Sequence, residues 1–173
     1  MQEDWKALIA KIAHWKQITN ENDKLGAFPW HLPRVAASDA RIAEAEAHVG
    51  VSFSAPYREL LSLADGWKGF CVSADLFGTE DFLSSRAIEV RDRPYVQEYI
   101  SETGLSNRDV VPIGASDVDM DVFLLISDTA VQSPGEVIWL AGSEVDRYLD
   151  VHEFFEAMVN YNARLAQQLI SQR

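Results

Sequence analysis

The chain has 173 residues, enough for one domain with a buried core, and nearly half of them are apolar. It carries 27 acidic and 15 basic residues, a net charge of −12, which disfavours nucleic acid and anionic membrane surfaces as partners and favours a basic protein. No apolar stretch is long enough to cross a bilayer and the acidic N-terminus lacks the features of a secretory signal, so we expect a cytoplasmic protein.

The first part of the chain predicts three helices. The first helix carries an apolar stripe with helical spacing, from Trp5 to Trp15, so we expect it to pack on the rest of the domain. The second helix ends at Gly50, because glycine readily adopts the left-handed conformation that closes many helices. The third ends at Asp65-Gly66. The expected ranges are 3–18, 38–49 and 55–65.

Extended segments and one further helix are expected next. Residues 68–73 predict a strand that contains Cys71, and this single cysteine excludes an internal disulfide or a zinc site built on several cysteines. We expect its thiol to be buried and unreactive. After a turn near 74–75, residues 77–83 predict a second short extended piece. A helix is expected at 93–103, with a proline in its first turn.

The spacing of apolar residues then changes to that of strands. Strands are expected at 110–114, 122–127 and 135–141, and a Ser-Pro-Gly turn makes the last two antiparallel neighbours. Pro112 indicates that the first of them lies at an edge or has an irregular end. Asp150 caps a final helix with an apolar face. Since helices and strands lie in blocks without βαβ alternation, the sequence predicts an α+β fold, a single domain with a mainly antiparallel sheet flanked by helices.

Acidic residues are concentrated in one quarter of the chain. Residues 114–156 contain ten acids and one base, and so supply −9 of the net charge of −12. Within this stretch Asp117, Asp119 and Asp121 alternate with apolar residues, so a strand would place their carboxylates on one face. An EF-hand calcium loop is disfavoured, because Val122 stands where that loop needs glycine.

Two interpretations of this acidic stretch stay open. The carboxylates can form a solvated surface that keeps the protein soluble. They can instead face a partner rich in lysine or arginine, because like charges that repel one another gain from opposite charge. In the second case Glu144 and Asp146 join the candidate partner-binding residues.

Two tryptophans lie in loop-like surroundings. Trp30 and Trp67 have proline or glycine nearby, whereas the other three fit helix or sheet faces. A partly exposed tryptophan can anchor an interface, which makes Trp67 a candidate partner-binding residue. The alternative is packing under the sheet, since large aromatic residues are highly buried on average.

No arrangement of residues points to catalysis. The four histidines are scattered without the spacing of a metal site, and none accompanies a serine or cysteine nucleophile motif. The nine glycines fit caps and turns rather than a phosphate-binding loop. We therefore expect no cofactor, no metal and no enzymatic activity.

The order of these segments resembles the SUKH superfamily. That superfamily is named partly for a fungal cell-wall assembly regulator, and its many bacterial members are immunity proteins that neutralise toxins. The similarity extends over about 41–161, with Asp-Gly where the family often has Asn-Gly, and an insertion at 86–107. The segments that carry it are Val49-Gly50-Val51, Ser54-Ala55-Pro56-Tyr57, Asp65-Gly66, Val111-Pro112-Ile113-Gly114, the strand around Trp139, and Val151-His152-Glu153-Phe154-Phe155.

The resemblance implies a SUKH-like fold and a protein-binding function. An immunity protein would bind a bacterial toxin domain, and family members commonly oppose nucleases, which must present cations to their substrate. The implied partner is therefore a basic toxin domain, and the implied mechanism is occlusion of its cleft by carboxylates. The alternative is a regulatory scaffold with a cellular partner and no toxin; an enzyme of unknown reaction is a third possibility.

Overall fold

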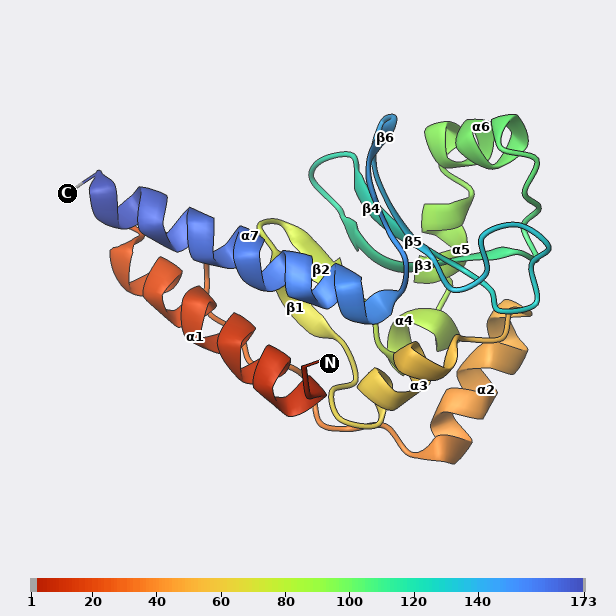
Figure 1. The fold of residues 1–173 in the computed structure, drawn as a ribbon, viewed down its shortest axis with the longest axis horizontal. Helices are drawn as coiled ribbons and strands as arrows, with labels where there is room; N and C mark the ends of the chain where they lie inside the picture. Colours follow the sequence, from red (N-terminus) through yellow and green to blue (C-terminus); the bar gives the residue numbers. More distant parts are fainter. Residues whose placement is uncertain (1–2, 173) are drawn as a thin grey trace.

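Residues 3–172 of the computed structural model form seven helices and one six-stranded sheet (Figure 1). The helices are α1 (Trp5–Asn22), α2 (Asp39–Val49), α3 (Ala55–Leu61), α4 (Thr79–Leu83), α5 (Arg86–Arg91), α6 (Pro94–Glu102) and α7 (Val151–Ser171). The strands are β1 (Trp67–Cys71), β2 (Ala74–Leu76), β3 (Val110–Ser116), β4 (Asp121–Ile126), β5 (Val137–Ala141) and β6 (Glu144–Tyr148). The predicted α+β fold is confirmed.

The sheet is an antiparallel meander with the order β1-β2-β3-β4-β5-β6. Since successive strands reverse direction, every second connection emerges at the same end of the sheet. The turns 72–73, 117–120 and 142–143 therefore share one end, while α4, α5 and α6 fill the connection between β2 and β3. The expected pairing of the strands around Phe123 and Trp139 is confirmed in β4 and β5.

Helices cover the sheet from two sides. Figure 1 shows α7 passing the sheet with α1 alongside it, while α5 and α6 lie away from this pair. Phe154 and Phe155 at the start of α7 are fully buried, and the ring of Trp5 on α1 meets Phe155 edge-on at 5.3 Å between centroids. The N-terminal helix therefore packs on the C-terminal one.

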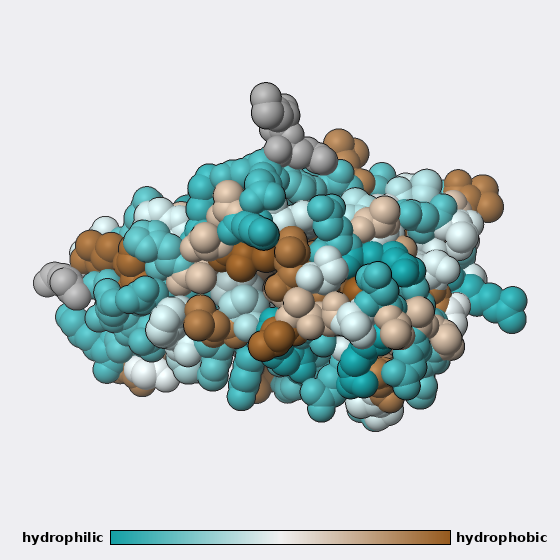
Figure 2. All heavy atoms as spheres, turned by 90° about the horizontal axis from the view of Figure 1, so that it is seen from below, coloured by the Kyte–Doolittle hydropathy of each residue, from teal (hydrophilic) through white to brown (hydrophobic). Residues whose placement is uncertain are grey.

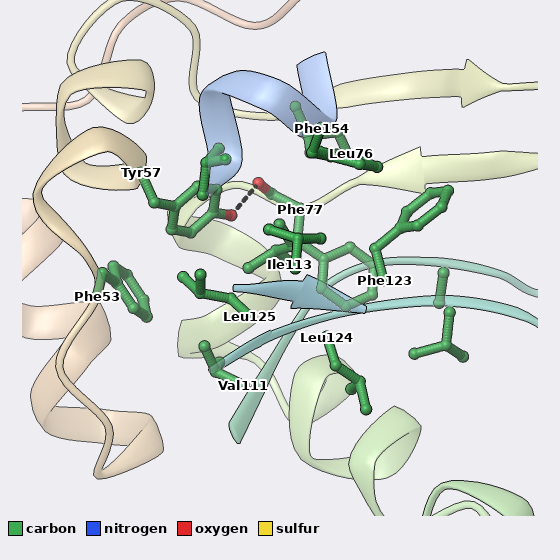
Figure 3. Packing of buried hydrophobic residues seen from close by; sticks show 14 of the residues in the cluster. Phe53, Tyr57, Leu76, Phe77, Val111, Ile113, Phe123, Leu124, Leu125 and Phe154 are labelled. Atoms are coloured by element: carbon green, nitrogen blue, oxygen red, sulfur yellow. Dashed lines mark hydrogen bonds between the residues drawn. The ribbon is translucent and has the colours of Figure 1, made fainter. Parts of the chain in front are cut away.

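Aromatic side chains pack α3 against the segment after β2 (Figure 3). The hydroxyl of Tyr57 is fully buried and donates a hydrogen bond of 2.8 Å to the carbonyl of Phe77. Phe53 and Phe82 pack at 4.8 Å between ring centroids beside them. This hydrogen bond satisfies a polar group that would otherwise be costly to bury.

Several local signals in the sequence act as predicted. Gly50 closes α2 with φ +71°, as expected of a glycine at this position. Ser38, which the sequence did not single out as a cap, accepts from the backbone N–H of Arg41 at the start of the same helix. The Asp150 carboxylate accepts from the N–H of Glu153, 2.8 Å away, and so caps α7. These contacts satisfy backbone groups that a helix leaves unpaired at its ends.

Other expectations are wrong. The turn expected at 74–75 lies two residues earlier, at Val72-Ser73, because Cys71 pairs with Ala74. The extended piece expected over 77–83 is largely α4, whose first turn is held by the Asp81 carboxylate accepting from Gly78 N–H at 2.9 Å. Pro112 lies in a central strand rather than at an edge, although the ladder is irregular between it and Gly114.

The surface seen from below is mainly hydrophilic, with apolar residues in small groups (Figure 2). Such scattered apolar exposure is normal for a folded protein. Among the helices of the described residues, none is both long and apolar enough to cross a membrane.

Candidate partner-binding surface

Three turns meet at one end of the sheet and form what we call the sheet tip, comprising Val72, residues 117–120 and Glu144. Ser73 in the first turn donates to the Asp119 carboxylate in the second and accepts from Ser116 at 2.9 Å. Apolar side chains are exposed here: Val118 is 83% exposed, Met120 47% and Val72 37%. The sheet tip thus combines uncovered apolar side chains with carboxylates, a composition typical of binding surfaces.

The expected single face of three carboxylates does not form, because Asp117 and Asp119 lie in the turn between β3 and β4 and only Asp121 belongs to a strand. Asp117 points to α5 and α6, where its carboxylate lies 2.8 Å from Arg86 and 3.6 Å from Arg93. Arg86 also pairs with Asp75 and Asp81, each at 3.0 Å. The charge of Asp117 is therefore shared with two guanidinium groups.

A cavity of about 540 Å³ opens beside Arg86. Its charged lining consists of three cations and three carboxylates, and Arg34 and Arg86 are both paired with Asp81. The charged side chains of the lining therefore sum to zero net charge. The charged lining residues are Arg34, Lys68, Asp75, Asp81, Arg86 and Asp117.

Asp119 and Asp121 differ in their surroundings. Burial alone would raise the pKa of Asp119, but hydrogen bonds from Ser73 and from the backbone of Asp121 outweigh it and lower that pKa. Burial raises the pKa of Asp121, and the neighbouring charge of Asp119 adds to this effect against a hydrogen bond from Trp139. Asp119 is the more exposed of the two, and it is the carboxylate of this pair that is better placed to meet a partner.

Trp139 connects Asp121 to Asp146. Its indole Nε1–H donates to the Asp121 carboxylate at 2.7 Å, and Asp146 lies opposite Trp139 in the β5–β6 register. The ring also meets Tyr161 of α7 edge-on, at 5.7 Å between centroids. Sequence analysis assigned Trp139 to the core, but the side chain is only half-buried. The sequence contained one indication of this position. The strand of Trp139 was expected to pair with the neighbouring strand, and an aspartate, Asp121, stands at the start of that strand.

Glu144 belongs to a cluster on the α6 side of the sheet. Tyr99 of α6 donates to its carboxylate at 2.6 Å, and Arg147 donates to it at 3.0 Å. The Arg147 hydrogen bond is the main reason that the pKa of Glu144 lies below its ordinary value. Arg147 also pairs with Glu136 at 2.6 Å, so this single base is held between two acids.

Trp67 cannot serve as an interface anchor. Its side chain is 1% exposed, packs against Phe70 at 5.9 Å between centroids and donates from Nε1 to the His31 carbonyl at 2.7 Å. The expectation that it contacts a partner is therefore wrong, and the alternative of core packing holds. Trp30, in contrast, is 41% exposed.

Candidates for metal binding or thiol chemistry are weak. Within residues 3–172, no group of three or more His, Cys, Asp or Glu side chains is placed to hold a metal ion. Cys71 is 2% exposed, as expected for a buried thiol, and burial raises its pKa to about 12. A thiol with so high a pKa is protonated at neutral pH and is a poor nucleophile.

Fold and surface together define an α+β protein whose antiparallel sheet presents carboxylates and apolar side chains at one end. Comparison with known families matches residues 36–160 to the SMI1 / KNR4 family (SUKH-1), and the chain belongs to this family. The match confirms the resemblance seen in the sequence. No curated protein shows significant similarity to the chain.

Proposed function

We propose that this protein is an immunity protein that binds a basic bacterial toxin domain, possessing no catalytic role of its own, and blocks the toxin by covering its active-site surface. The observation that carries the proposal is the gathering of Val118, Met120, Asp119 and Glu144 on adjacent turns of the sheet tip. Membership in a family that includes immunity proteins and regulators supports the same class of function.

The two kinds of side chain on the sheet tip have different physical roles. Carboxylates attract a basic partner over a distance and raise the association rate. Apolar side chains such as Val118, once covered by the partner, slow dissociation through the area they remove from water. A nuclease is the toxin class that fits best, because its cleft must carry cations to bind phosphate.

Co-expression tests the proposal. A toxin domain encoded beside this protein should stop growth when expressed alone, and the intact protein should restore growth. Val118→Asp should abolish the rescue, because it replaces an exposed apolar side chain that the partner would cover with a carboxylate that is costly to bury, without disturbing the core. Glu44→Lys, on the exposed face of α2, is the matched control and should rescue fully.

A pull-down from the source cell at low salt, repeated at high salt, identifies the partner. Capture of a basic toxin that is released at high salt supports the proposal. Capture of a cellular protein without toxic activity would instead favour a regulatory scaffold. A toxin that Val118→Asp still neutralises would exclude the sheet tip as the contact surface.

A further inference from the structure

The last strand of the sheet leaves one edge open. Among the described strands, β6 pairs only with β5, and the first four of its five residues are exposed. An edge strand presents backbone N–H and C=O groups that another extended chain can pair with. In β6 the N–H of Arg147 donates to the Asp146 carboxylate at 2.8 Å, so a strand that pairs at this residue would replace that contact and release the carboxylate. The ladder irregularity between Trp139 and Leu140 bends this edge, which discourages indiscriminate pairing between copies.

A groove runs beside this edge, between β6 and α7. It has a volume of about 330 Å³, and three of its eight lining residues are aromatic. Trp139 lies on the sheet side and Tyr161 on the helix side, with their rings edge to face. The aromatic and charged residues of its lining are Trp139, Asp146, Tyr148, Tyr161 and Arg164.

The two walls of the groove carry opposite charges. On the sheet wall, Asp146 lies opposite Trp139, and the Trp139 indole donates to the Asp121 carboxylate. Two carboxylates beside an indole favour a cation, which gains from both the charges and the aromatic face. Arg164 lies on the α7 wall, so a cationic side chain has its favourable position on the sheet wall, beside β6.

The base on β6 does not oppose this arrangement. Arg147 is turned to the other side of the sheet, where Glu136, Glu144 and the hydroxyl of Tyr99 hold its guanidinium. Asp146 and Arg147 are sequence neighbours in a strand and so point to opposite faces. The groove side of β6 is therefore acidic, while its opposite side is neutralised.

We propose that β6 accepts an extended segment of the protein partner as a seventh strand, with a lysine or arginine side chain of that segment placed between Asp146 and the rings of Trp139 and Tyr161. The proposal rests on the proposed function in one respect, that the partner is a basic protein. It adds how the partner is recognised: the main chain of the partner pairs with the edge of β6, and a cationic side chain of the partner binds in the groove.

A synthetic octapeptide of alternating threonine and lysine, with blocked ends, is the probe. Titrated into the isotopically labelled full chain, it should shift the NMR signals of Glu144–Tyr148 amides and of the Trp139 indole. A threonine–glutamate octapeptide should not bind. A proline–lysine octapeptide keeps the charge but lacks amide donors at alternate positions, and should bind at least about threefold more weakly.

Charge variants of the groove sharpen the test. Asp146→Asn should weaken binding of the lysine peptide by at least about threefold, and Arg164→Glu should strengthen it by a similar factor, since both side chains line the groove. Glu44→Lys on α2 should leave the affinity for the peptide unchanged. Signal shifts spread over the acidic surface without β6, or equal affinity of the Arg164→Glu variant, would overturn the proposal.

The outcomes separate this proposal from the proposed function. If Val118→Asp abolishes growth rescue while the lysine peptide leaves β6 unshifted, the immunity function stands and the seventh strand is excluded. If the peptide binds at β6 but no toxin is captured, the groove stands and the immunity function is excluded.

Discussion

Gly78 is the point where the turn after α3 meets the start of α4. A Cβ at this position would overlap the carbonyl group of Asp65, while the Asp65 carboxylate accepts from the N–H and the hydroxyl of Thr79, both at 2.6 Å. The backbone φ of Gly78 is −119°, which any residue can adopt. The need for glycine here is therefore one of space and not of conformation.

We expect Gly78→Ala to lower the free energy of unfolding by about 3 kcal/mol or more, because backbone atoms on both sides must move apart. Gly50→Ala is the comparison: it has φ +71° and open space around it, so it should cost only about 1 kcal/mol. Urea unfolding of both variants measures the difference. Equal losses would mean that the contact with Asp65 relaxes freely.

Val72 has an unfavourable backbone conformation in the turn between β1 and β2. Its φ is +54°, which is rare for a β-branched residue, and its side chain is 37% exposed on the sheet tip. Strain of this kind commonly persists at functional positions. We expect Val72→Gly to raise the free energy of unfolding by about 1 kcal/mol in thermal or urea unfolding. The same variant should bind the toxin domain more weakly, whereas an unchanged affinity would separate Val72 from the interface.

Individual residues could be predicted from sequence where the reason is local. Gly50 and Asp150 act as caps, as predicted, because capping depends on the few residues that precede or follow them. The half-buried position of Trp139 and the burial of Lys16 depend on which distant elements pack beside them. Periodicity within one helix or strand does not contain that information.

At the scale of elements, Lys16 joins α1 to the edge strand β1. Its side chain is 9% exposed and its ammonium group donates to the carbonyl of Gly69. Burial lowers the pKa of Lys16 to about 8, against the opposing effect of the negative charge of Asp75. Lys16 therefore belongs to the buried face of α1, together with its apolar residues.

This burial predicts an unusual pH dependence of stability. The folded pKa of Lys16 is lower than its unfolded value of about 10.4, so the unfolded state binds more protons and stability rises with pH above about 8. Between pH 8 and 9 the free energy of unfolding should rise by about 1 kcal/mol relative to a Lys16→Met variant. Both chains should carry Cys71→Ala, because titration of the unfolded thiol acts in the opposite direction. Parallel pH profiles would contradict the lowered pKa.

The elements missed by sequence analysis are short or exposed. α4 and α5 have five and six residues, too few to show a helical period. β6 exposes four of its five residues, so it lacks the alternation that marks a half-buried strand. The long helices and the buried strands β3, β4 and β5 could be predicted because the spacing of their apolar residues indicates both the type of element and its burial.

At the scale of the whole molecule, the sequence predicted the acidic stretch but not its distribution. Asp117 turns toward Arg86, Glu144 toward Arg147, and Asp146 toward the groove on the other side of the sheet. The family match begins at residue 36, so α1 lies outside it, yet this helix packs along α7. Charge count is a property of composition, whereas the face that a charge occupies follows from strand order and register.

The net charge of −12 predicts that electrostatics govern how fast a basic toxin domain associates. Raising the salt concentration from about 0.05 to 0.5 M shortens the screening length several-fold and should slow association by at least about tenfold. Dissociation should change much less, because the apolar side chains of the sheet tip are covered in the complex. Stopped-flow kinetics measure both rates.

Two variants separate the effect of the charges on association from the effect of the apolar contacts on dissociation. Asp119→Lys should slow association at low salt and flatten its salt dependence, because it reverses an exposed charge on the sheet tip. Val118→Asp should speed dissociation at every salt concentration, since the valine is 83% exposed and free to be covered by the partner. An association rate that Asp119→Lys leaves unchanged at low salt would mean that the toxin approaches from another face of the molecule.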